Sequence, residues 1–135
     1  MKIENLKLTI VLLFLFRLTY AQKNDILDKL CHKVRFLNSK SLVLEKNSHL
    51  VLDSICNIIK KDSLNYIVES HSATMQNAIE KTKNRAELLR KELIKRGVKK
   101  SRLNSIGHGV SKRKFICTTR VCNMQNERIE IKRID

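Results

Sequence analysis

The sequence predicts an α+β fold in which a small mixed sheet of about four strands has two main helices packed on one face. First, apolar residues recur at helical spacing in two long segments, residues 45–61 and 76–96. Second, short strand-like runs separate these segments and follow them. Third, residues 128–134 alternate apolar and polar side chains, which predicts a strand with one face on a helix layer and the other in water.

The N-terminus is typical of a secretory signal peptide over residues 1–21. Lys2 and Lys7 supply the positive start, residues 8–16 form an apolar run, and residues 19–21 fit a cleavage site. The run is shorter than the roughly 20 residues that cross a bilayer. An uncleaved N-terminal anchor is the alternative, and the mature chain has no predicted membrane span.

A lead-in segment at residues 22–33 precedes one domain at residues 34–135. The lead-in is predicted to be a short helix that packs on the sheet, because it has apolar residues at helical spacing: Ile26, Leu27 and Leu30. Residues 33–37 predict the first strand, and a polar turn follows at residues 38–41.

The remaining elements follow in the order helix, strand, helix, strand, strand. The first main helix, residues 45–61, has an apolar face formed by Leu50, Val51, Ile55, Ile58 and Ile59. Residues 64–69 predict the second strand. The second helix, residues 76–96, is predicted to bury Ile79, Ala86, Leu89 and Leu93 and to stop at Gly97. Residues 102–106 and 128–134 predict the last two strands.

The chain is strongly basic, with 28 Lys and Arg against 13 Asp and Glu and a net charge of +15. Removing residues 1–21 takes away three basic residues and one acidic residue, so the mature chain keeps a net charge of +13. This balance favours anionic partners, although the cations are spread along the chain as on an ordinary solvated surface. There is no Trp and few aromatic residues, so no specific nucleic-acid partner is expected.

Four short motifs follow the predicted elements in a fixed order. They are Ser70-His71-Ser72-Ala73, Lys81-Thr82-x-x-Arg85-Ala86, Gly107-His108-Gly109 and Asn126-Glu127-Arg128-Ile129-Glu130-Ile131. Their order and spacing resemble the G-H-T-D, L-S-x-x-R-A, G-x-G and N-x-R-V-E-I signatures of the OmpA-like domain. That domain is the peptidoglycan-binding module of Gram-negative outer-membrane proteins, Pal-type lipoproteins and flagellar stator proteins. The resemblance covers roughly residues 34–134.

The resemblance implies a ligand pocket. In that family an Asp takes the ammonium group of the diaminopimelate in the peptidoglycan stem peptide, and an Arg takes its carboxylate in a bidentate fork. Arg85 matches the family's Arg, and Ser72, Ala73 and the turn around Asn38 would complete the pocket. By the residues alone, Arg85 reads as one of many exposed arginines on a basic helix, and only the resemblance favours a ligand-binding role.

The family's Asp position is held by Ala73, and the nearest acids in sequence are Glu69 and Glu80. Truncating one partner of a buried charge pair costs about 2–5 kcal/mol of binding. We therefore expect weakened or altered binding of peptidoglycan. A ligand that has carboxylates and no free amine is one hypothesis.

The other motif residues are expected to be structural. By the resemblance, His71 is a hydrogen-bonding residue at a strand end, and Asn126 and Arg128 pin the last strand. Gly107 and Gly109 are expected to serve the backbone of a tight turn. No nucleophile stands at a telling spacing from a base, so neither enzymatic activity nor a cofactor is expected.

The four cysteines, Cys31, Cys56, Cys117 and Cys122, predict disulfides in an exported protein, with three possible pairings. Closing the small loop between Cys117 and Cys122 is the simplest choice, and some members of the resembled family have a disulfide near there. Cys31 would then pair with Cys56. A zinc site of Cys117, Cys122, His71 and His108 is the rival, but the sequence offers no second ligand pair, so no metal is expected.

The sequence thus predicts a non-catalytic domain of the periplasm or outer membrane that attaches to the cell wall. The alternative is a basic exported interaction module that binds another anionic envelope component or an acidic envelope protein. Salt separates the two, because diffuse charge attraction is screened more than a pocketed charge pair.

Overall fold

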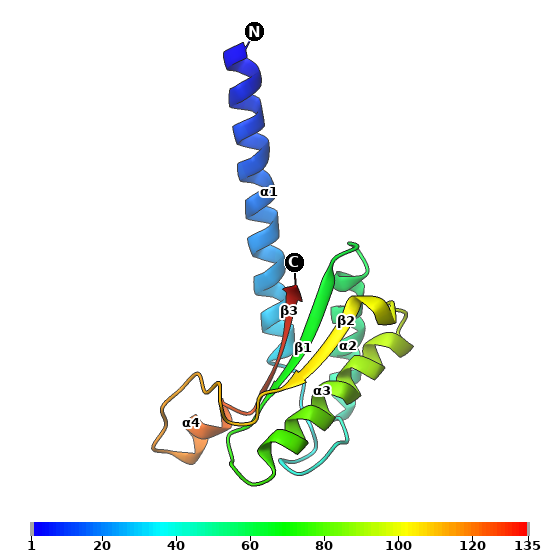
Figure 1. Cartoon of the computed structure of the whole chain (residues 1–135), viewed down its shortest axis with the longest axis vertical. Coiled ribbons are helices and arrows are strands. Elements are labelled where there is room, and N and C mark those ends of the chain that lie inside the picture. Colours follow the sequence, from blue (N-terminus) through cyan, green and yellow to red (C-terminus); the bar gives the residue numbers. More distant parts are fainter. Residues whose placement is uncertain (1, 135) are drawn as a thin grey trace.

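The computed structural model describes residues 2–134 and contains one sheet with helices on one of its faces (Figure 1). The α+β class predicted from the sequence is confirmed. In chain order the elements are α1 (Lys2–Cys31), α2 (Lys46–Ile59), β1 (Asn65–His71), α3 (Ala78–Lys95), the 3-10 turn η1 (Lys100–Arg102), β2 (Leu103–Gly107), α4 (Arg120–Met124) and β3 (Arg128–Ile134).

The sheet has the order β2-β1-β3. β1 and β2 run parallel and are connected by α3, with Tyr66 opposite Leu103. β3 runs antiparallel to β1, with His71 opposite Arg128. The central position of β1 brings the end of β1 next to the start of β3, although the two lie far apart in sequence.

The core lies between the sheet and the helices. Ala86, Leu89 and Leu93 of α3 are fully buried, as the sequence predicts. Burying one such aliphatic side chain contributes about 1.5–3 kcal/mol. The end of α1 adds Leu27 and Cys31 to the same core. Gly97 follows α3 with a φ of 95°, so the predicted left-handed helix stop is confirmed.

The predicted strand at residues 33–37 is wrong, and the described sheet has three strands rather than four. This segment folds back on the chain that follows it. The backbone N–H of Leu37 donates to the carbonyl of Val43 at 2.9 Å, and that of Glu45 donates to the carbonyl of Arg35 at 3.0 Å. These local bonds use the groups that would otherwise pair with the sheet.

Two apolar residues placed on the buried helix faces are exposed. Leu50 has 69% of its surface exposed and Ile79 has 62%. The buried face of α2 has a different phase and consists of Ser48, Leu52, Ile55, Cys56 and Ile59. The prediction considered only apolar residues and therefore missed this face, which begins with Ser48. The Ser48 hydroxyl is satisfied in the core because it donates to the Arg35 carbonyl.

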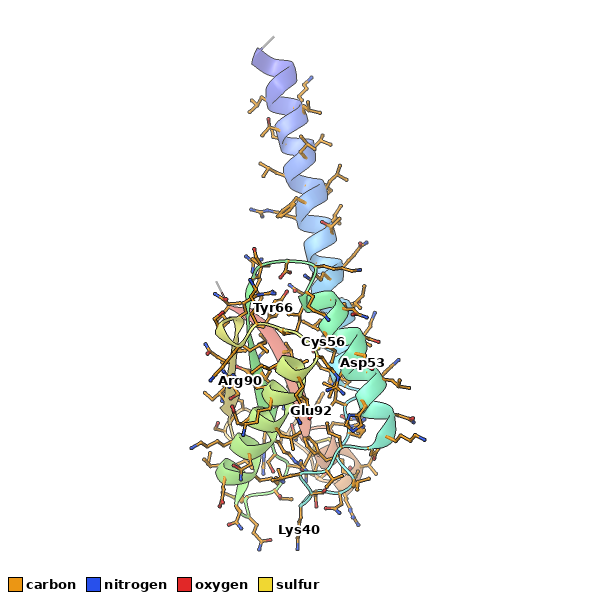
Figure 2. The ribbon with its side chains drawn as sticks, turned by 90° about the vertical axis from the view of Figure 1, so that its right-hand side faces the viewer. Lys40, Asp53, Cys56, Tyr66, Arg90 and Glu92 are labelled. Carbon is orange, nitrogen blue, oxygen red and sulfur yellow. A yellow bond between two sulfur atoms is a disulfide. The ribbon has the colours of Figure 1, made fainter. Side chains whose placement is uncertain are left out.

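α1 continues through the predicted cleavage site as one helix and extends away from the rest of the chain (Figures 1 and 2). The described side chains of residues 6–19 are exposed, and the core begins at Leu27. Among the described residues, no helix combines the length and apolar character that crossing a membrane requires. Residues 22–135 therefore keep the whole described core, and the signal peptide at residues 1–21 stays a prediction.

The cysteines divide into one pair and two free thiols. Cys117 and Cys122 form the expected disulfide. Cys31 and Cys56 are both free and buried, so their expected pairing is wrong. The Cys31 thiol contacts the backbone of Ile131 in β3, whereas the Cys56 thiol (Figure 2) points toward the carbonyl of Leu93 in α3. The two thiols face different neighbours in the core, and burial raises the pKa of Cys31 to about 12.

Candidate functional site

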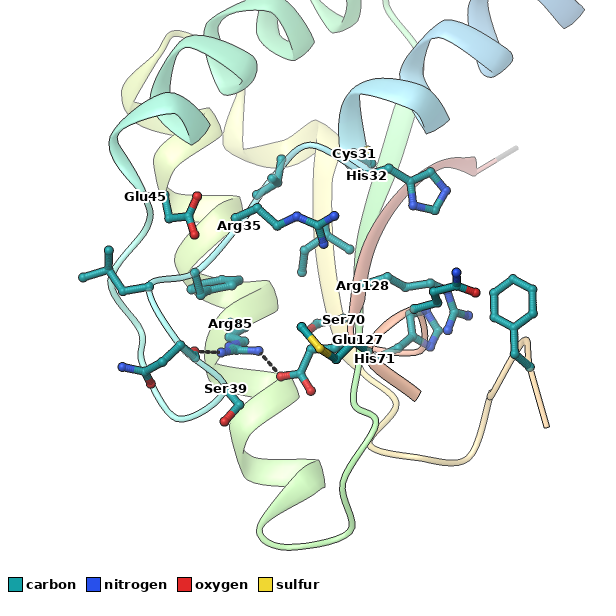
Figure 3. Close-up of a pocket in the computed structure, with 18 residues that line it drawn as sticks. Cys31, His32, Arg35, Ser39, Glu45, Ser70, His71, Arg85, Glu127 and Arg128 are labelled. Atoms are coloured by element: carbon teal, nitrogen blue, oxygen red, sulfur yellow. Dashed lines mark hydrogen bonds and ion pairs between the residues drawn. The ribbon is translucent and has the colours of Figure 1, made fainter. Parts of the chain in front are cut away.

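A cavity of about 850 Å³ opens where β1 ends and β3 begins. Its walls come from the turn after α1, from α3 and from the loop before β3 (Figure 3). Its volume lies in the range of small-molecule sites, roughly 300–1,000 Å³. The residues that line this cavity include Phe36, Asn38, Ser70, His71, Arg85, Glu127 and Arg128.

Arg85 is a buried cation of this cavity, with only 3% of its surface exposed. Its Nη2 donates to the carbonyls of Asn38 at 2.8 Å and Ser41 at 3.1 Å. The guanidinium lies over the ring of Phe36, 4.1 Å from its centroid. The turn after α1 therefore holds the guanidinium plane in one orientation, and its carbonyls take up the donors of Nε and Nη2, so Nη1 is the nitrogen that faces Glu127.

The acid beside Arg85 is Glu127, which joins the guanidinium from the other side of the cavity (Figure 3). Arg85 Nη1 donates to Glu127 Oε1 at 2.6 Å, and Lys81 Nζ lies 3.1 Å from the same oxygen. Glu127 Oε2 accepts one long bond, 3.4 Å from the backbone N–H of Ala73. A carboxylate thus lies next to the position where the resembled family has its Asp.

Strand pairing explains why sequence distance missed Glu127. His71 of β1 faces Arg128 of β3 in the antiparallel register. The residue before Arg128 therefore lies beside the residues that follow His71 in the chain, among them Ala73. Glu69 and Glu80 are closer in sequence, but neither forms an ion pair with Arg85 in the described structure.

The charges of this cluster do not balance. Arg85 and Lys81 share the single carboxylate of Glu127, so the cluster has one positive charge in excess. An anionic group would be attracted to it. Glu127 Oε2 still has capacity to accept a strong hydrogen bond, which suits an ammonium group. The two features together suit a zwitterionic ligand end.

The structure brings together some of the predicted site residues and not others. Asn38 lies in the wall and touches Arg85 through its carbonyl. Ser72 is buried outside the wall: its N–H donates to the Gly109 carbonyl at 2.7 Å, and its hydroxyl donates to the Thr74 carbonyl. Ala73 also lies outside the wall and meets the site only through its contact with Glu127.

Asn126 fastens the loop before β3. Its side chain is fully buried, accepts from the N–H groups of Lys114 and Phe115, and donates to the Phe115 carbonyl at 3.0 Å. Arg128 donates to the Lys112 carbonyl at 3.0 Å. These contacts hold the loop over the start of β3, directly beside Glu127.

Gly107 allows β2 to approach α3. A Cβ at this position would lie 2.2 Å from the backbone nitrogen of Lys83. Gly109 has a φ of 55°, and its N–H donates to the Thr82 hydroxyl at 3.0 Å. The tight turn through His108 therefore depends on both glycines for its backbone geometry.

The sheet face opposite the helices is not the wet face that the alternation predicts. Glu69, His71, Arg128 and Glu130 are all buried there, beneath the loop before β3. Burial would raise the pKa of Glu130, but Lys132, Arg128 and Lys114 hold it far below its usual value. The alternation of β3 is real, but its polar side chains Arg128 and Glu130 are buried and pair with each other, whereas Lys132 is half exposed and pairs with Glu130 from the edge.

His71 does not act as the hydrogen-bonding residue expected from the sequence. Only 2% of it is exposed, and neither ring nitrogen has a hydrogen-bond partner among the described residues. Its ring stacks on that of His108 with the centroids 4.9 Å apart. Burial and the nearby Arg128 charge lower the pKa of His71 to about 4, so the imidazole is neutral near pH 7.

No protein-family model and no curated protein matches this sequence. Among solved structures, the C-terminal domain of Helicobacter pylori MotB superposes with a TM-score of 0.68 at 24% identity, covering 74% of this chain and 81% of that chain. The peptidoglycan-associated lipoprotein from Burkholderia pseudomallei gives 0.66 at 15% identity, covering 75% and 89%.

The OmpA-like domain of FopA1 from Francisella tularensis gives a TM-score of 0.60 at 13% identity, covering 76% of this chain and 73% of that chain. At these levels of sequence identity, the superpositions show a shared fold. The shared fold agrees with the positions of the four motifs, which lie at the ends of β1 and β2, at the start of β3 and on α3. This chain has the OmpA-like fold.

Proposed function

We propose that the chain is a non-catalytic module of the bacterial cell envelope that binds peptidoglycan stem peptides through Arg85 and Glu127. The observation that carries this proposal is the unbalanced cluster in the cavity, where Arg85 and Lys81 share one carboxylate. An incoming carboxylate would supply the missing negative charge. It would bind at a guanidinium that the turn after α1 already holds in place.

Glu127 takes the role of the Asp that is replaced by Ala73. The stem-peptide residue diaminopimelate ends in an ammonium and a carboxylate. Arg85 and Lys81 receive the carboxylate, and Glu127 Oε2 receives the ammonium, because this oxygen has only the long contact with Ala73. Binding is altered rather than lost, since Glu127 already occupies one guanidinium nitrogen and must share it with the ligand.

Periplasmic placement follows from the proposed ligand and from the predicted signal peptide at residues 1–21. The fold resemblance to the lipoprotein and to the MotB domain supports the same placement. A disulfide between Cys117 and Cys122 is compatible with an oxidising compartment.

Co-sedimentation with purified peptidoglycan sacculi tests the proposal. The protein is residues 22–135, at low and near-molar salt, beside Arg85→Lys and Glu127→Gln. Arg85→Lys keeps the charge but loses the planar fork, and Glu127→Gln keeps the size but loses the charge. Lys83→Ala is the matched control, because it removes an exposed cation from the same helix.

Salt-resistant binding that Arg85→Lys and Glu127→Gln both weaken, and that Lys83→Ala leaves intact, supports the proposal. Binding that disappears at high salt, or that Lys83→Ala lowers as much as the other two variants, contradicts it. The second outcome would favour the alternative in which the basic surface, with its net charge of +15 in the whole chain, meets an anionic envelope component.

A further inference from the structure

Three metal-ligating side chains converge on the sheet face opposite the helices. Glu69 and His71 are two positions apart in β1, so their side chains lie on the same face of the sheet. His108 is the first residue after β2. Ser70 is paired with Gly107 in the parallel register, and the His108 N–H donates to the Ser70 carbonyl at 2.9 Å. One ring nitrogen of each histidine and a Glu69 oxygen all lie within 4.8 Å of one another.

The histidines lack the partners that buried imidazoles normally have. Within the part of the chain that the structure describes, neither nitrogen of His71 makes a hydrogen bond, nor does Nε2 of His108, and both side chains are at least nine-tenths buried. His108 Nε2 approaches Glu69 Oε1 to 3.2 Å without the alignment of a hydrogen bond. His71 Nε2 lies 3.7 Å from Glu69 Oε2. Leaving such buried polar groups unsatisfied destabilises the fold, so the arrangement favours a partner between them.

We propose that Glu69, His71 and His108 form a binding site for a divalent transition metal ion, with Zn²⁺ as the best match. Two imidazole nitrogens and one carboxylate oxygen are a ligand set that zinc accepts, with a fourth position left open. This site is separate from the Arg85–Glu127 clamp, and its existence does not depend on peptidoglycan binding.

The spacing of the donor atoms permits this site. Zinc ligands lie about 2.0–2.2 Å from the ion, so neighbouring ligand atoms are about 3.3 Å apart in a tetrahedral site. Of the present donors, His108 Nε2 and Glu69 Oε1 are already 3.2 Å apart, and all the donor atoms lie within 4.8 Å of one another.

Lys132 competes with a metal ion for the Glu69 carboxylate, but its side chain is free to move away from it. Its Nζ lies 2.6 Å from both Glu69 Oε2 and Glu130 Oε2, and 51% of its side chain is exposed. When a metal ion binds Glu69, Lys132 keeps its contact with Glu130. Glu130 Oε2 lies 3.9 Å from His71 Nε2, so this second carboxylate stands next to the site as an outer partner.

The zinc site considered from the sequence used a different set of ligands. It combined the two histidines with Cys117 and Cys122, but these cysteines are joined in a disulfide. Glu69 takes their place because strand pairing brings β1 and the end of β2 together.

Titration calorimetry of residues 22–135 with Zn²⁺ tests the site, beside His108→Ala and Glu69→Gln. His49→Ala is the matched control, because His49 is exposed on α2 and contacts Arg96 instead. We expect one zinc ion per chain. Loss of an outer-shell partner lowers metal affinity about 10–100-fold, so loss of a direct ligand is expected to cost at least about 100-fold. His49→Ala should bind as the unchanged protein does.

Histidine ring resonances in NMR spectra of the unchanged protein give a second readout that does not depend on the folding of any variant. Zn²⁺ should shift the rings of His71 and His108 and leave those of His32 and His49 in place. Absorption of the Co²⁺-loaded protein should lack the thiolate band that ligation by Cys31 or Cys56 would give. No zinc binding, shifts at all four histidines, or a thiolate band would each overturn the proposal.

Discussion

Both faces of the sheet bury side chains around β1 and β3, but by different means. The face toward the helices is apolar and includes Val68, Leu103 and Ile131. The opposite face buries charges and imidazoles under the loop before β3: Glu69, His71, Arg128 and Glu130. The first face is stabilised by removing apolar surface from water, whereas the second depends on each polar group finding its own partner.

The difference shows in how each face tolerates change. An apolar core accepts many sequences that conserve volume. A buried polar cluster accepts few, because removing one member leaves another without a partner. The cavity with Arg85 and Glu127 lies where the two faces meet, at the end of β1 and the start of β3.

The largest loss of stability is expected from a substitution that opens a cavity in the apolar face. Leu89 of α3 is fully buried, so Leu89→Ala should lower the free energy of unfolding by about 2–5 kcal/mol. Leu50→Ala is the matched control, because Leu50 is 69% exposed and should change it by no more than about 0.5 kcal/mol. Urea unfolding of residues 22–135 measures both. Equal losses of stability in the two variants would mean that Leu50 is buried, which would contradict the buried face of α2.

The second-largest loss of stability is expected from removing one charge on the opposite face of the sheet. Glu130→Gln removes the carboxylate that pairs with Arg128 at 2.6 Å and with Lys114 at 3.0 Å. Breaking a buried ion pair from one side costs about 3 kcal/mol, because the remaining charge stays buried. The same urea titration measures the loss. A variant as stable as the unchanged protein would mean that this face is wetter than the structure describes.

The disulfide should have a somewhat smaller effect. Cys117 and Cys122 lie 5 positions apart in the sequence and close a short loop beside Asn126. By the chain-entropy relation, a loop of that size stabilises by about 2 kcal/mol. Thermal unfolding with and without reductant measures it. Cys31→Ser and Cys56→Ser variants should retain the full response to reductant, since both thiols are free. Loss of the response in either variant would show that the pairing is different.

The apolar face could largely be predicted from the sequence. Periodicity placed α3 and β3 and identified Ala86, Leu89 and Leu93 as buried, because hydrophobic burial leaves a repeat in the chain. It failed at Ser48, where a polar residue begins the buried face of α2, and at residues 33–37, where local hydrogen bonds replaced sheet pairing.

The polar site could be predicted only in part. Motif resemblance singled out Arg85 and Asn38, which the cavity brings together. It did not reveal Glu127, because the search for an acid followed sequence distance. The antiparallel register of β1 and β3 would have revealed it, since that register places the neighbour of Arg128 beside Ala73. A buried polar contact is fixed by pairing across strands, and pairing leaves no periodic pattern in one chain.

The central claim is that Glu127 replaces the acid absent at Ala73, and one calorimetric comparison tests it most directly. Residues 22–135 and their Glu127→Gln variant are each titrated with a diaminopimelate-containing stem peptide and with the same peptide acetylated on its free side-chain amine. Acetylation should weaken binding to the unchanged protein by about 2–5 kcal/mol, or tens-fold to thousands-fold, and should scarcely affect the variant. An equal penalty in both proteins, or none in either, would contradict the claim.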